Sequence, residues 1–528
     1  MNKLNFKYLF PNLFLFCICM NLTACSEKNS GEDNLQSGDE IISFEPDLNT
    51  LIRNPASGWT LYDDANDYVA QANTYWNQQG AAAEKYASIF YWRSRWSELE
   101  PEEGKYAWEH DENFKALIQG ALDRGLKLAF RVYIDGQDNI HNGTPDFVRE
   151  AGAKGYAVHK LWDPANENNN WTPYADDPVF QEKFGNFIRA FAKEFDNPEQ
   201  VDFIDAYNLG WWGEGHHVQY LNNNNKFKVY QWITDLYAEN FKNVLLVVNF
   251  GTEIGFEYEK RLAIDKHDFL TRRDGIGSYW FQDAEVNIIN SLFPQKAFIA
   301  EGCYWGGNSD SYQPWNTDPL YADKFKSWSD FYAQAYKDAI RGHANTLDLR
   351  EATETRGWIT HAKDLVKDFI SNGGYRLTPI QIEYPVSVQM GNTLSIKHIW
   401  RNSGVGVCPN NNKRWNYKYK VSFALLDPES HEIKQRITDE NAEPSAWIKG
   451  TDKTYKTSES LIVPAGQYIL AVAITDDTQN QKPGLNLAVK NGKFINDWLQ
   501  KHNYNEKITF LFSSNTTHCY DLMFRRQQ

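Results

Sequence analysis

The feature that most constrains the fold lies between Asn54 and Tyr375, where short apolar runs rich in β-branched residues alternate with amphipathic segments. Such alternation is typical of a parallel sheet built from βα units. The predicted strands are Gly58–Tyr62, Ala87–Trp92, Lys127–Tyr133, Val201–Asn208, Val244–Phe250, Gly275–Trp280, Lys296–Ala300 and Thr346–Leu349. Eight strands predict a (β/α)8 TIM barrel. The alternative is a doubly wound open sheet, which the lack of a Gly-rich first turn disfavours.

The pattern changes after Leu377, where strand-like runs are separated by Gly, Asn, Asp and Pro turns. This pattern indicates an antiparallel β-sandwich. The expected α/β architecture is a TIM-barrel catalytic domain over residues 46–376, followed by a β-sandwich accessory domain over 377–491. For the C-terminal tail, 492–528, we expect a short helix and one strand and assign no role.

The chain begins with a basic and then an apolar segment that ends in Leu22-Thr23-Ala24-Cys25. This pattern is typical of a lipoprotein signal peptide, so we expect residues 1–24 to be removed and Cys25 to carry the lipid. A plain membrane anchor is disfavoured because the apolar run is shorter than the roughly 20 residues that a spanning helix needs. The polar segment 25–45 is a predicted flexible tether. We therefore expect an exported protein anchored to a bacterial membrane, the outer one by preference, that faces the periplasm or the cell surface.

The amino-acid composition limits the classes of ligand that the chain is expected to bind. The net charge of −15 disfavours nucleic acid, whose phosphates would be repelled. Cys303, Cys408 and Cys519 are too scattered for a disulfide scaffold or a zinc site, and no phosphate-binding glycine loop occurs, so we expect no cofactor. Aromatic residues reach 15%, with 19 Trp, and flat rings beside polar groups are suited to stacking on sugars. A carbohydrate is the expected partner.

Two glutamates follow predicted barrel strands, at the end where TIM-barrel enzymes carry their reacting groups. Glu214 follows the fourth strand and is flanked by glycines, tryptophans and histidines, and Glu301 directly follows the seventh strand. Either glutamate alone could be a helix cap or the partner of an arginine. Together, on strands that face each other across one barrel mouth, they indicate a catalytic pair. Two facing carboxyl groups supply the acid and the nucleophile or base that glycosidic-bond hydrolysis requires.

The run from Trp96 to Trp108, WSELEPEEGKYAW, resembles the "W..LEP.EG.Y.W" segment of retaining TIM-barrel glycoside hydrolases, in the clan that includes β-galactosidases and xylanases. This resemblance implies that Glu214, after strand four, is the acid/base and that Glu301, after strand seven, is the nucleophile. Barrel and sandwich together resemble bacterial lipoproteins known mainly as domains of unknown function. Their Gly-x-Trp-Gly-Glu-x-His motif is similar to residues 210–216. The clan carries Asn before the acid/base, whereas Gly213 stands here.

Other residues at strand ends or beside the glutamates are predicted to bind substrate. They are Arg93, Arg131, Asn208, Trp211, Trp212, His216, Asn249, Tyr279 and Trp305. The resemblance implies that Arg93 holds the nucleophile and that Tyr279 lies near it, and Asn208 is the expected substitute for the clan's missing Asn. We expect no metal, because His216 and His217 have no third ligand at helical spacing.

The sequence thus predicts an O-glycosyl hydrolase that acts on poly- or oligosaccharide by retaining double displacement. The alternative is a non-catalytic carbohydrate-binding surface lipoprotein on an inactive barrel. A weaker alternative is an inverting hydrolase that uses Glu253 or Glu351.

Overall fold

The computed structural model describes residues 38–63, 70–135, 142–158, 170–303, 325–389 and 391–500, and strand β22 (Ile508–Leu511). The predicted signal peptide, Cys25 and Trp305 lie outside the described residues, as does most of the predicted tether. None of the helices in the described ranges combines the length and the apolar character of a membrane span.

Eight parallel strands close into a barrel in the order β10-β11-β2-β3-β4-β7-β8-β9, so the predicted TIM barrel is confirmed. The strands are β2 (Gly58–Tyr62), β3 (Ala87–Arg95), β4 (Lys127–Tyr133), β7 (Val201–Asp205), β8 (Leu245–Asn249), β9 (Leu270–Ile276), β10 (Phe298–Gly302) and β11 (Ala344–Arg350). The prediction of the sixth strand at 275–280 is wrong. Strand β9 lies earlier, and it was missed because Arg272, Arg273 and Asp274 interrupt its apolar pattern.

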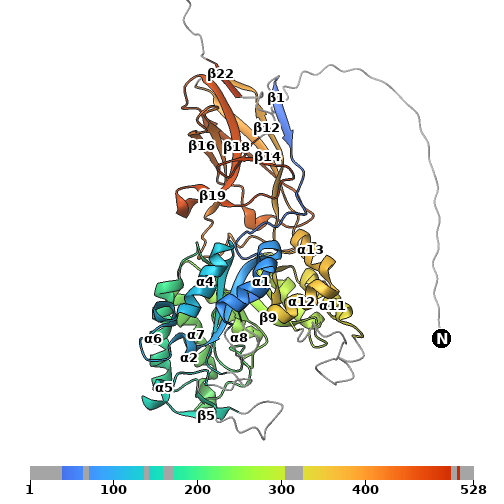
Figure 1. Cartoon of the computed structure of the whole chain (residues 1–528). Helices are drawn as coiled ribbons and strands as arrows, with labels where there is room; N and C mark the ends of the chain where they lie inside the picture. The colour runs from blue at the N-terminus through green and yellow to red at the C-terminus, as the bar shows by residue number, and fades with distance from the viewer. Residues whose placement is uncertain are drawn as a thin grey trace, which may run out of the picture. The chain divides into compact units, whose positions relative to one another are not determined.

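Helices surround the barrel (Figure 1). They are α1 (Ala72–Tyr86), α2 (Trp96–Leu99), α3 (Ala107–His110), α4 (Glu112–Asp123), α5 (Asp146–Glu150), α6 (Pro178–Phe195), α7 (Lys226–Asn240), α8 (Phe256–Glu259), α9 (Asp283–Leu292), α11 (Trp328–Arg341), α12 (Ala352–His361) and α13 (Lys363–Asn372). Helix α6 shows how local sequence sets an element. The Asp177 carboxylate accepts the backbone N–H groups of Val179 and Phe180, and phenylalanines at helical spacing form the buried face.

The barrel interior changes from apolar to charged within two residues along several strands. Alternate residues of a strand point to the same side, so the interior is built in layers. The layer at the amino ends includes Ile89, Ala129, Phe203, Leu270 and Ile299. Two positions further along the same strands stand Tyr91, Arg131, Asp205, Arg272 and Glu301. The charged layer therefore lies toward the carboxyl ends of the strands.

The C-terminal region forms two sheets, which confirms the predicted β-sandwich. One sheet has the order β1-β12-β14-β17, and the other has the order β13-β22-β18-β15-β16 with short strands at its side. The strands are β1 (Asp39–Ser43), β12 (Leu377–Pro385), β13 (Ser387–Gln389), β14 (Thr393–Asn402), β15 (Tyr419–Leu426), β16 (Ile433–Asp439), β17 (Lys453–Ser460), β18 (Gly466–Asp476), β19 (Lys482–Leu485), β20 (Lys493–Ile495) and β21 (Trp498–Gln500). Burial alternates along β14, as expected for a strand with one core face.

Two end segments differ from the expectations. Residues 39–43, which fall in the predicted tether, form β1 and pair with β12 in antiparallel register, from Asp39 opposite Pro385 to Ser43 opposite Gln381 (Figure 1). After residue 491, β20 and β21 form a hairpin where a short helix was expected. Asn496 and Asp497 have φ of 48° and 65°, and such left-handed pairs close two-residue hairpins.

The sandwich packs against the amino ends of the barrel strands. One apolar cluster contains the barrel residues Phe203 and Leu270 together with Trp400 and Phe423 of the sandwich. Hydrogen bonds add to this contact, because the Asn345 side-chain amide donates to the Val407 carbonyl at 2.8 Å. The carboxyl ends of the barrel strands therefore lie at the end away from this contact.

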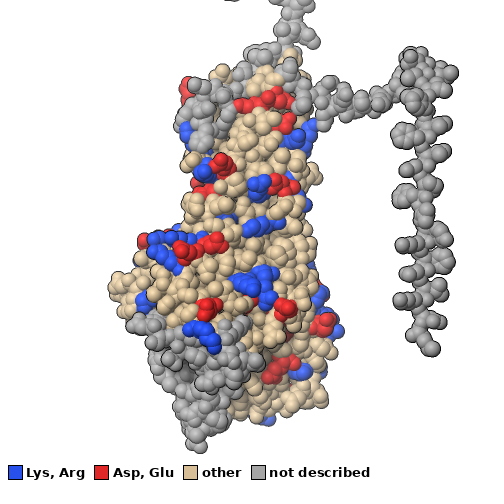
Figure 2. All heavy atoms as spheres, turned by 90° about the vertical axis from the view of Figure 1, so that its right-hand side faces the viewer, with Lys and Arg blue, Asp and Glu red and all other residues tan. Residues whose placement is uncertain are grey.

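Charges on the surface are mixed in sign. On the face shown in Figure 2, small groups of Lys and Arg side chains lie among small groups of Asp and Glu, and uncharged residues cover most of the rest. That face carries no extended basic patch of the kind that binds a nucleic-acid backbone.

Candidate active site

A tight turn after β7 carries Glu214. Gly213 has a φ of +73°, and a Cβ placed on it would lie 3.3 Å from the Tyr133 side chain on β4. Trp212 and His217 also adopt left-handed backbone, with φ of 54° and 53°. Such backbone strain concentrates at functional sites. The positive φ favours glycine at position 213.

Glu301 is the fourth residue of β10 and faces the barrel interior, on the same side of the strand as Ile299. The next residue, Gly302, donates its backbone N–H to the Asp348 carboxylate at 2.6 Å. Glu214 and Glu301 are 5% and 4% exposed. Charged side chains this deeply buried require partners.

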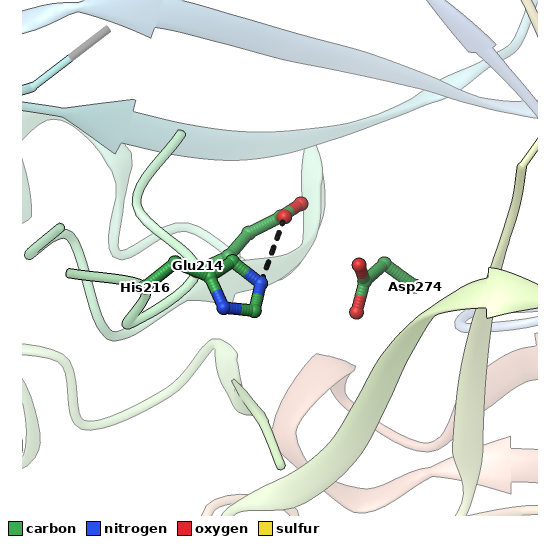
Figure 3. A group of neighbouring side chains, drawn as sticks. All are labelled: Glu214, His216 and Asp274. Atoms are coloured by element: carbon green, nitrogen blue, oxygen red, sulfur yellow. Dashed lines mark ion pairs between the residues drawn. The ribbon is translucent and has the colours of Figure 1, made fainter. Parts of the chain in front are cut away.

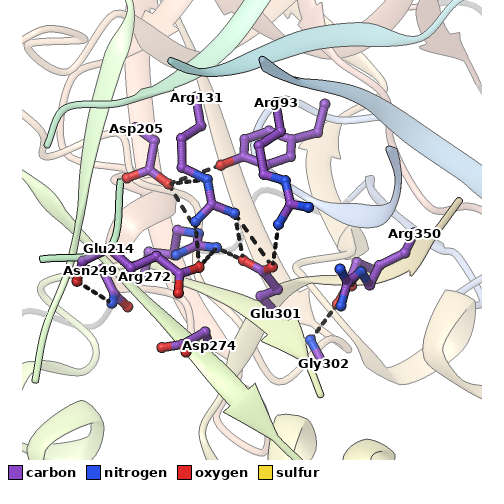
Figure 4. A network of polar contacts seen from close by, with 12 residues as sticks. Arg93, Arg131, Asp205, Glu214, Asn249, Arg272, Asp274, Glu301, Gly302 and Arg350 are labelled. Atoms are coloured by element: carbon purple, nitrogen blue, oxygen red, sulfur yellow. Dashed lines mark hydrogen bonds and ion pairs between the residues drawn. The ribbon is translucent and has the colours of Figure 1, made fainter. Parts of the chain in front are cut away.

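Two arginines bind both glutamates (Figure 4). Arg131 Nη1 lies 2.5 Å from Glu214 Oε1, and Arg131 Nη2 lies 3.2 Å from Glu301 Oε2. Arg272 Nη2 lies 3.5 Å from Glu214 Oε1 and also contacts Glu301 Oε2. Because one nitrogen atom contacts both carboxylates, their oxygens are separated by no more than about two hydrogen-bond lengths, ~6 Å. The structure thus brings the two predicted glutamates into one site.

Asp205 lies on the other side of the same arginines. Its Oδ2 is 3.1 Å from Arg272 Nε and 3.9 Å from Arg131 Nε, and it accepts a hydrogen bond from the Tyr91 hydroxyl at 2.9 Å. The Asp205 side chain is almost fully buried. The site is therefore a network in which three carboxylates share two guanidinium groups.

His216 and Asp274 flank the open side of Glu214 (Figure 3). His216 Nε2 lies 3.8 Å from Glu214 Oε2, and one oxygen or nitrogen of each of the three side chains lies within 4.8 Å of the others. Such a trio could ligate a cation, but Arg131 and Arg272 contact Glu214, and Arg273 contacts Asp274. These positive charges offset the negative charge that would hold a metal, so we assign no metal here.

Several predicted binding residues join this network. Arg93 Nη1 is 3.9 Å from Glu301 Oε1, and the Asn249 amide donates to the Glu214 carbonyl oxygen at 3.4 Å. Arg131 and His216 contact the glutamates as described above. These residues come from β3, β4 and β8 and from the turn after β7.

Other predicted residues lie differently. The Asn208 amide donates to the Val132 carbonyl on β4, and among the described residues it makes no hydrogen bond to either glutamate. Its use in place of the clan's Asn stays a prediction. Trp211 is half-buried and stacks on His217 with ring centroids 3.8 Å apart. Trp212 and Tyr279 are also half-buried. Half-buried aromatic rings of this kind are suited to stacking on a sugar.

Three residues of the site were not predicted: Asp205, Arg272 and Asp274. For Asp205 and Arg272 the signal was a charged residue two positions after an apolar interior residue, Phe203 and Leu270. Asp274 lacks this signal, because the residue two positions before it is the charged Arg272. Period-two alternation on barrel strands could have found Asp205 and Arg272.

Burial shifts the ionisation of carboxyl groups around the mouth. Burial raises the pKa of Asp135, which follows β4, to about 7, although a hydrogen bond from Tyr156 opposes the shift. At Asp274, burial raises the pKa, but the charges of Arg273, His216 and Arg272 outweigh it and hold the pKa below its usual range. Two carboxyl groups at the barrel mouth therefore differ in proton affinity.

No protein-family model matches the chain, and no sequence among the curated proteins matches it. Among solved structures, the chain is similar to endo-glycoceramidase II from Rhodococcus sp., with 12% identity over 80% of this chain and 100% of that chain and a TM-score of 0.39. It is also similar to a GH30 endoxylanase from Clostridium papyrosolvens, with 11% identity, coverages of 79% and 98% and a TM-score of 0.36. A third is the catalytic domain of beta-amylase from Paenibacillus polymyxa, with 7% identity, coverages of 59% and 99% and a TM-score of 0.38. Likeness at this level assigns neither reaction nor substrate to this chain.

Proposed function

We propose that this chain is a glycoside hydrolase that cleaves poly- or oligosaccharide with retention, with Glu301 as nucleophile and Glu214 as acid/base. The observation that carries the proposal is the contact of one nitrogen, Arg272 Nη2, with both carboxylates at the carboxyl end of the barrel. Catalysis of this kind requires two carboxyl groups that reach the same glycosidic bond.

The two glutamates have different surroundings, which supports different roles. Glu301 contacts three guanidinium groups, those of Arg93, Arg131 and Arg272, and their charges stabilise the carboxylate that attacks the anomeric carbon. Glu214 meets Arg131 and Arg272 through Oε1 alone, whereas Oε2 faces His216 on the open side. This difference supports Oε2 as the oxygen that gives a proton to the leaving group.

The spacing of the carboxyls favours retention over inversion. Retaining enzymes hold the two groups about 5 to 5.5 Å apart, and inverting enzymes about 6.5 to 9.5 Å apart, to leave room for water. A nitrogen atom shared by the two carboxylates limits the distance between their nearest oxygens to ~6 Å, which supports the closer arrangement. Water then enters only after the leaving group departs, when Glu214 accepts its proton and the glycosyl–Glu301 ester is hydrolysed.

Hydrolysis of a panel of glycans and aryl glycosides by the purified protein tests the proposal. Proton NMR of the first-formed product gives the anomer, and mass spectrometry with a 2-fluoro glycoside identifies the trapped nucleophile. We expect retention and a label on Glu301. A protein that binds glycans but hydrolyses none of the panel would be the carbohydrate-binding alternative, and an inverted product would refute double displacement.

The membrane anchor is a separate proposal. The lipobox Leu22-Thr23-Ala24-Cys25 supports lipidation of Cys25 and export to a bacterial outer membrane. Metabolic labelling with an alkyne fatty acid tests it, since Cys25→Ala should abolish the label and release the protein from the membrane fraction. Equal labelling of the wild type and the variant would contradict it.

A further inference from the structure

We infer that Asp205 is a positioning residue that lets Glu214 keep its proton, because it competes with Glu214 for the two arginines that bind both catalytic glutamates. This inference rests on the proposed function. Asp205 approaches the arginines from the side of their Nε atoms, whereas the glutamates bind their Nη atoms. The charge of Asp205 therefore reaches Glu214 through the arginines, without direct contact with the substrate.

The effect of Asp205 on Glu214 is the difference between the network with the Asp205 charge and the network without it. With Asp205 ionised, three carboxylates share the positive charge of Arg131 and Arg272. Without that charge, the same two guanidinium groups are left to the two glutamates alone, and they stabilise ionised Glu214 more strongly. An acid that is already ionised cannot protonate a leaving group. The network is buried, so water screens little of this effect.

The neighbouring tyrosines do not replace this charge. Tyr62 on β2, Tyr91 on β3 and Tyr237 on α7 face the cluster, and burial raises the pKa of each hydroxyl well above its usual value. They are neutral throughout the pH range of an assay. Tyr91 donates a hydrogen bond to Asp205 and so orients its carboxylate.

The remaining charged neighbours are present whether or not Asp205 is ionised. Arg93 lies beside Glu301, Asp348 lies 3.9 Å from Arg350, and on the open side Asp274 is in contact with Arg273. His216 faces Glu214 Oε2. Because these groups are the same in the wild type and in an Asp205 variant, the difference between the two proteins reports the Asp205 charge.

The test compares D205N with the wild type in the pH dependence of kcat/KM, on two glycosides of one sugar. One carries an activated aryl leaving group and the other an alkyl leaving group. We expect the basic limb of the D205N profile to move to lower pH by about one unit or more. At the wild-type optimum, kcat/KM should decrease at least about tenfold for the alkyl glycoside and by less than about threefold for the aryl glycoside, which needs little protonation.

Y91F is the matched control, because it removes a hydrogen bond to the same carboxylate and leaves the charge in place. Its basic limb should stay within about 0.3 pH unit of the wild type. Equal losses of D205N on both substrates with an unmoved pH profile would mean a purely structural role and overturn the inference. If D205N melts below the assay temperature, the smaller uncharged variant D205S is measured instead. A wild type that hydrolyses nothing overturns the proposed function itself, whereas an active wild type with an unshifted D205N profile overturns only the role of Asp205.

Discussion

The barrel and the sandwich both bury polar side chains, but they satisfy them differently. In the sandwich, the Trp400 indole donates to His398 Nδ1 at 2.8 Å, and His398 Nε2 lies 2.9 Å from Asp439 Oδ2. An indole N–H only donates, so His398 Nε2 carries the proton that faces Asp439. In the charged layer of the barrel, Asp205 Oδ1, Asn249 Oδ1 and Arg272 Nη1 are buried without a hydrogen-bond partner among the described residues.

This difference separates a network built for stability from one built for a ligand. Buried polar atoms are normally paired, since an unmet donor or acceptor costs roughly 1–3 kcal/mol. In the sandwich network, the Trp400 indole N–H and both ring nitrogens of His398 are already paired, so they cannot bind a ligand. The barrel layer retains donors and acceptors near two buried glutamates, which is expected where a substrate or its bound water completes the hydrogen bonds.

The largest expected effect is the loss of catalysis when the nucleophile in the barrel is removed. Glu301→Ala should lower kcat by roughly 10⁴-fold or more, because it removes the nucleophile. Glycan affinity should stay nearly intact, since the aromatic rings and the remaining polar groups supply most ground-state binding. Stopped-assay kinetics and calorimetric titration measure the two quantities, with Glu239→Ala, at an exposed position of α7, as the control. Turnover retained in Glu301→Ala would refute the assignment of the nucleophile.

A smaller effect is expected at Glu214. Glu214→Ala should lower kcat/KM by about 10² to 10⁴-fold for a glycoside with a sugar leaving group, because general acid catalysis is lost. An activated aryl glycoside should lose less, and added azide should restore part of its turnover by attacking the glycosyl-enzyme. Steady-state kinetics on both substrates measure the asymmetry. Equal losses on every substrate would contradict the acid/base role.

In the sandwich, loss of a buried polar partner is expected to lower the stability of the protein. His398→Ala should lower the free energy of unfolding by about 3 kcal/mol, because it leaves Asp439 and the Trp400 indole buried without their partner. Denaturant titration measures this loss, while KM of any small glycoside should not change. On the same strand, Arg401 pairs with Asp452 in an exposed position. Arg401→Ala is the control and should cost less than about 1 kcal/mol. Similar losses in the two variants would remove the distinction between buried and exposed pairs.

The smallest expected effect is a change in the pH dependence of stability. Burial raises the pKa of Glu354 to about 8, although Arg350 opposes the shift. The folded protein then binds more protons at this group than the unfolded chain between its ordinary value and about pH 8, so its contribution makes stability fall as pH rises through that window. Glu354→Gln should make this fall shallower in melting temperatures measured from pH 5 to 8.5. The exposed Glu109→Gln should leave the slope unchanged, and an unchanged slope in Glu354→Gln would contradict the assignment.

The sequence could predict the barrel because apolar runs and amphipathic helices alternate in it, and strand ends located Glu214 and Glu301. It could not predict β9, since interior charges such as Arg272 and Asp274 replace the apolar residues that mark a strand. It also could not predict the backbone contact of Asn208, whose amide donates to β4, because that contact is set by tertiary packing that one sequence does not display.

Strand β1 has a consequence for how the chain folds. It leaves the ribosome before any barrel strand, yet its partner β12 follows the last barrel helix, so the whole barrel is closed as a loop between two neighbouring strands of one sheet. Pairing across so long a separation is slow, and an unpaired edge strand is prone to wrong association. A fragment cut after residue 376 would carry β1 with no β12 to receive it. An isolated barrel is therefore best made without residues 39–43. In the intact protein, β1 can pair only after β12 of the sandwich has been synthesised.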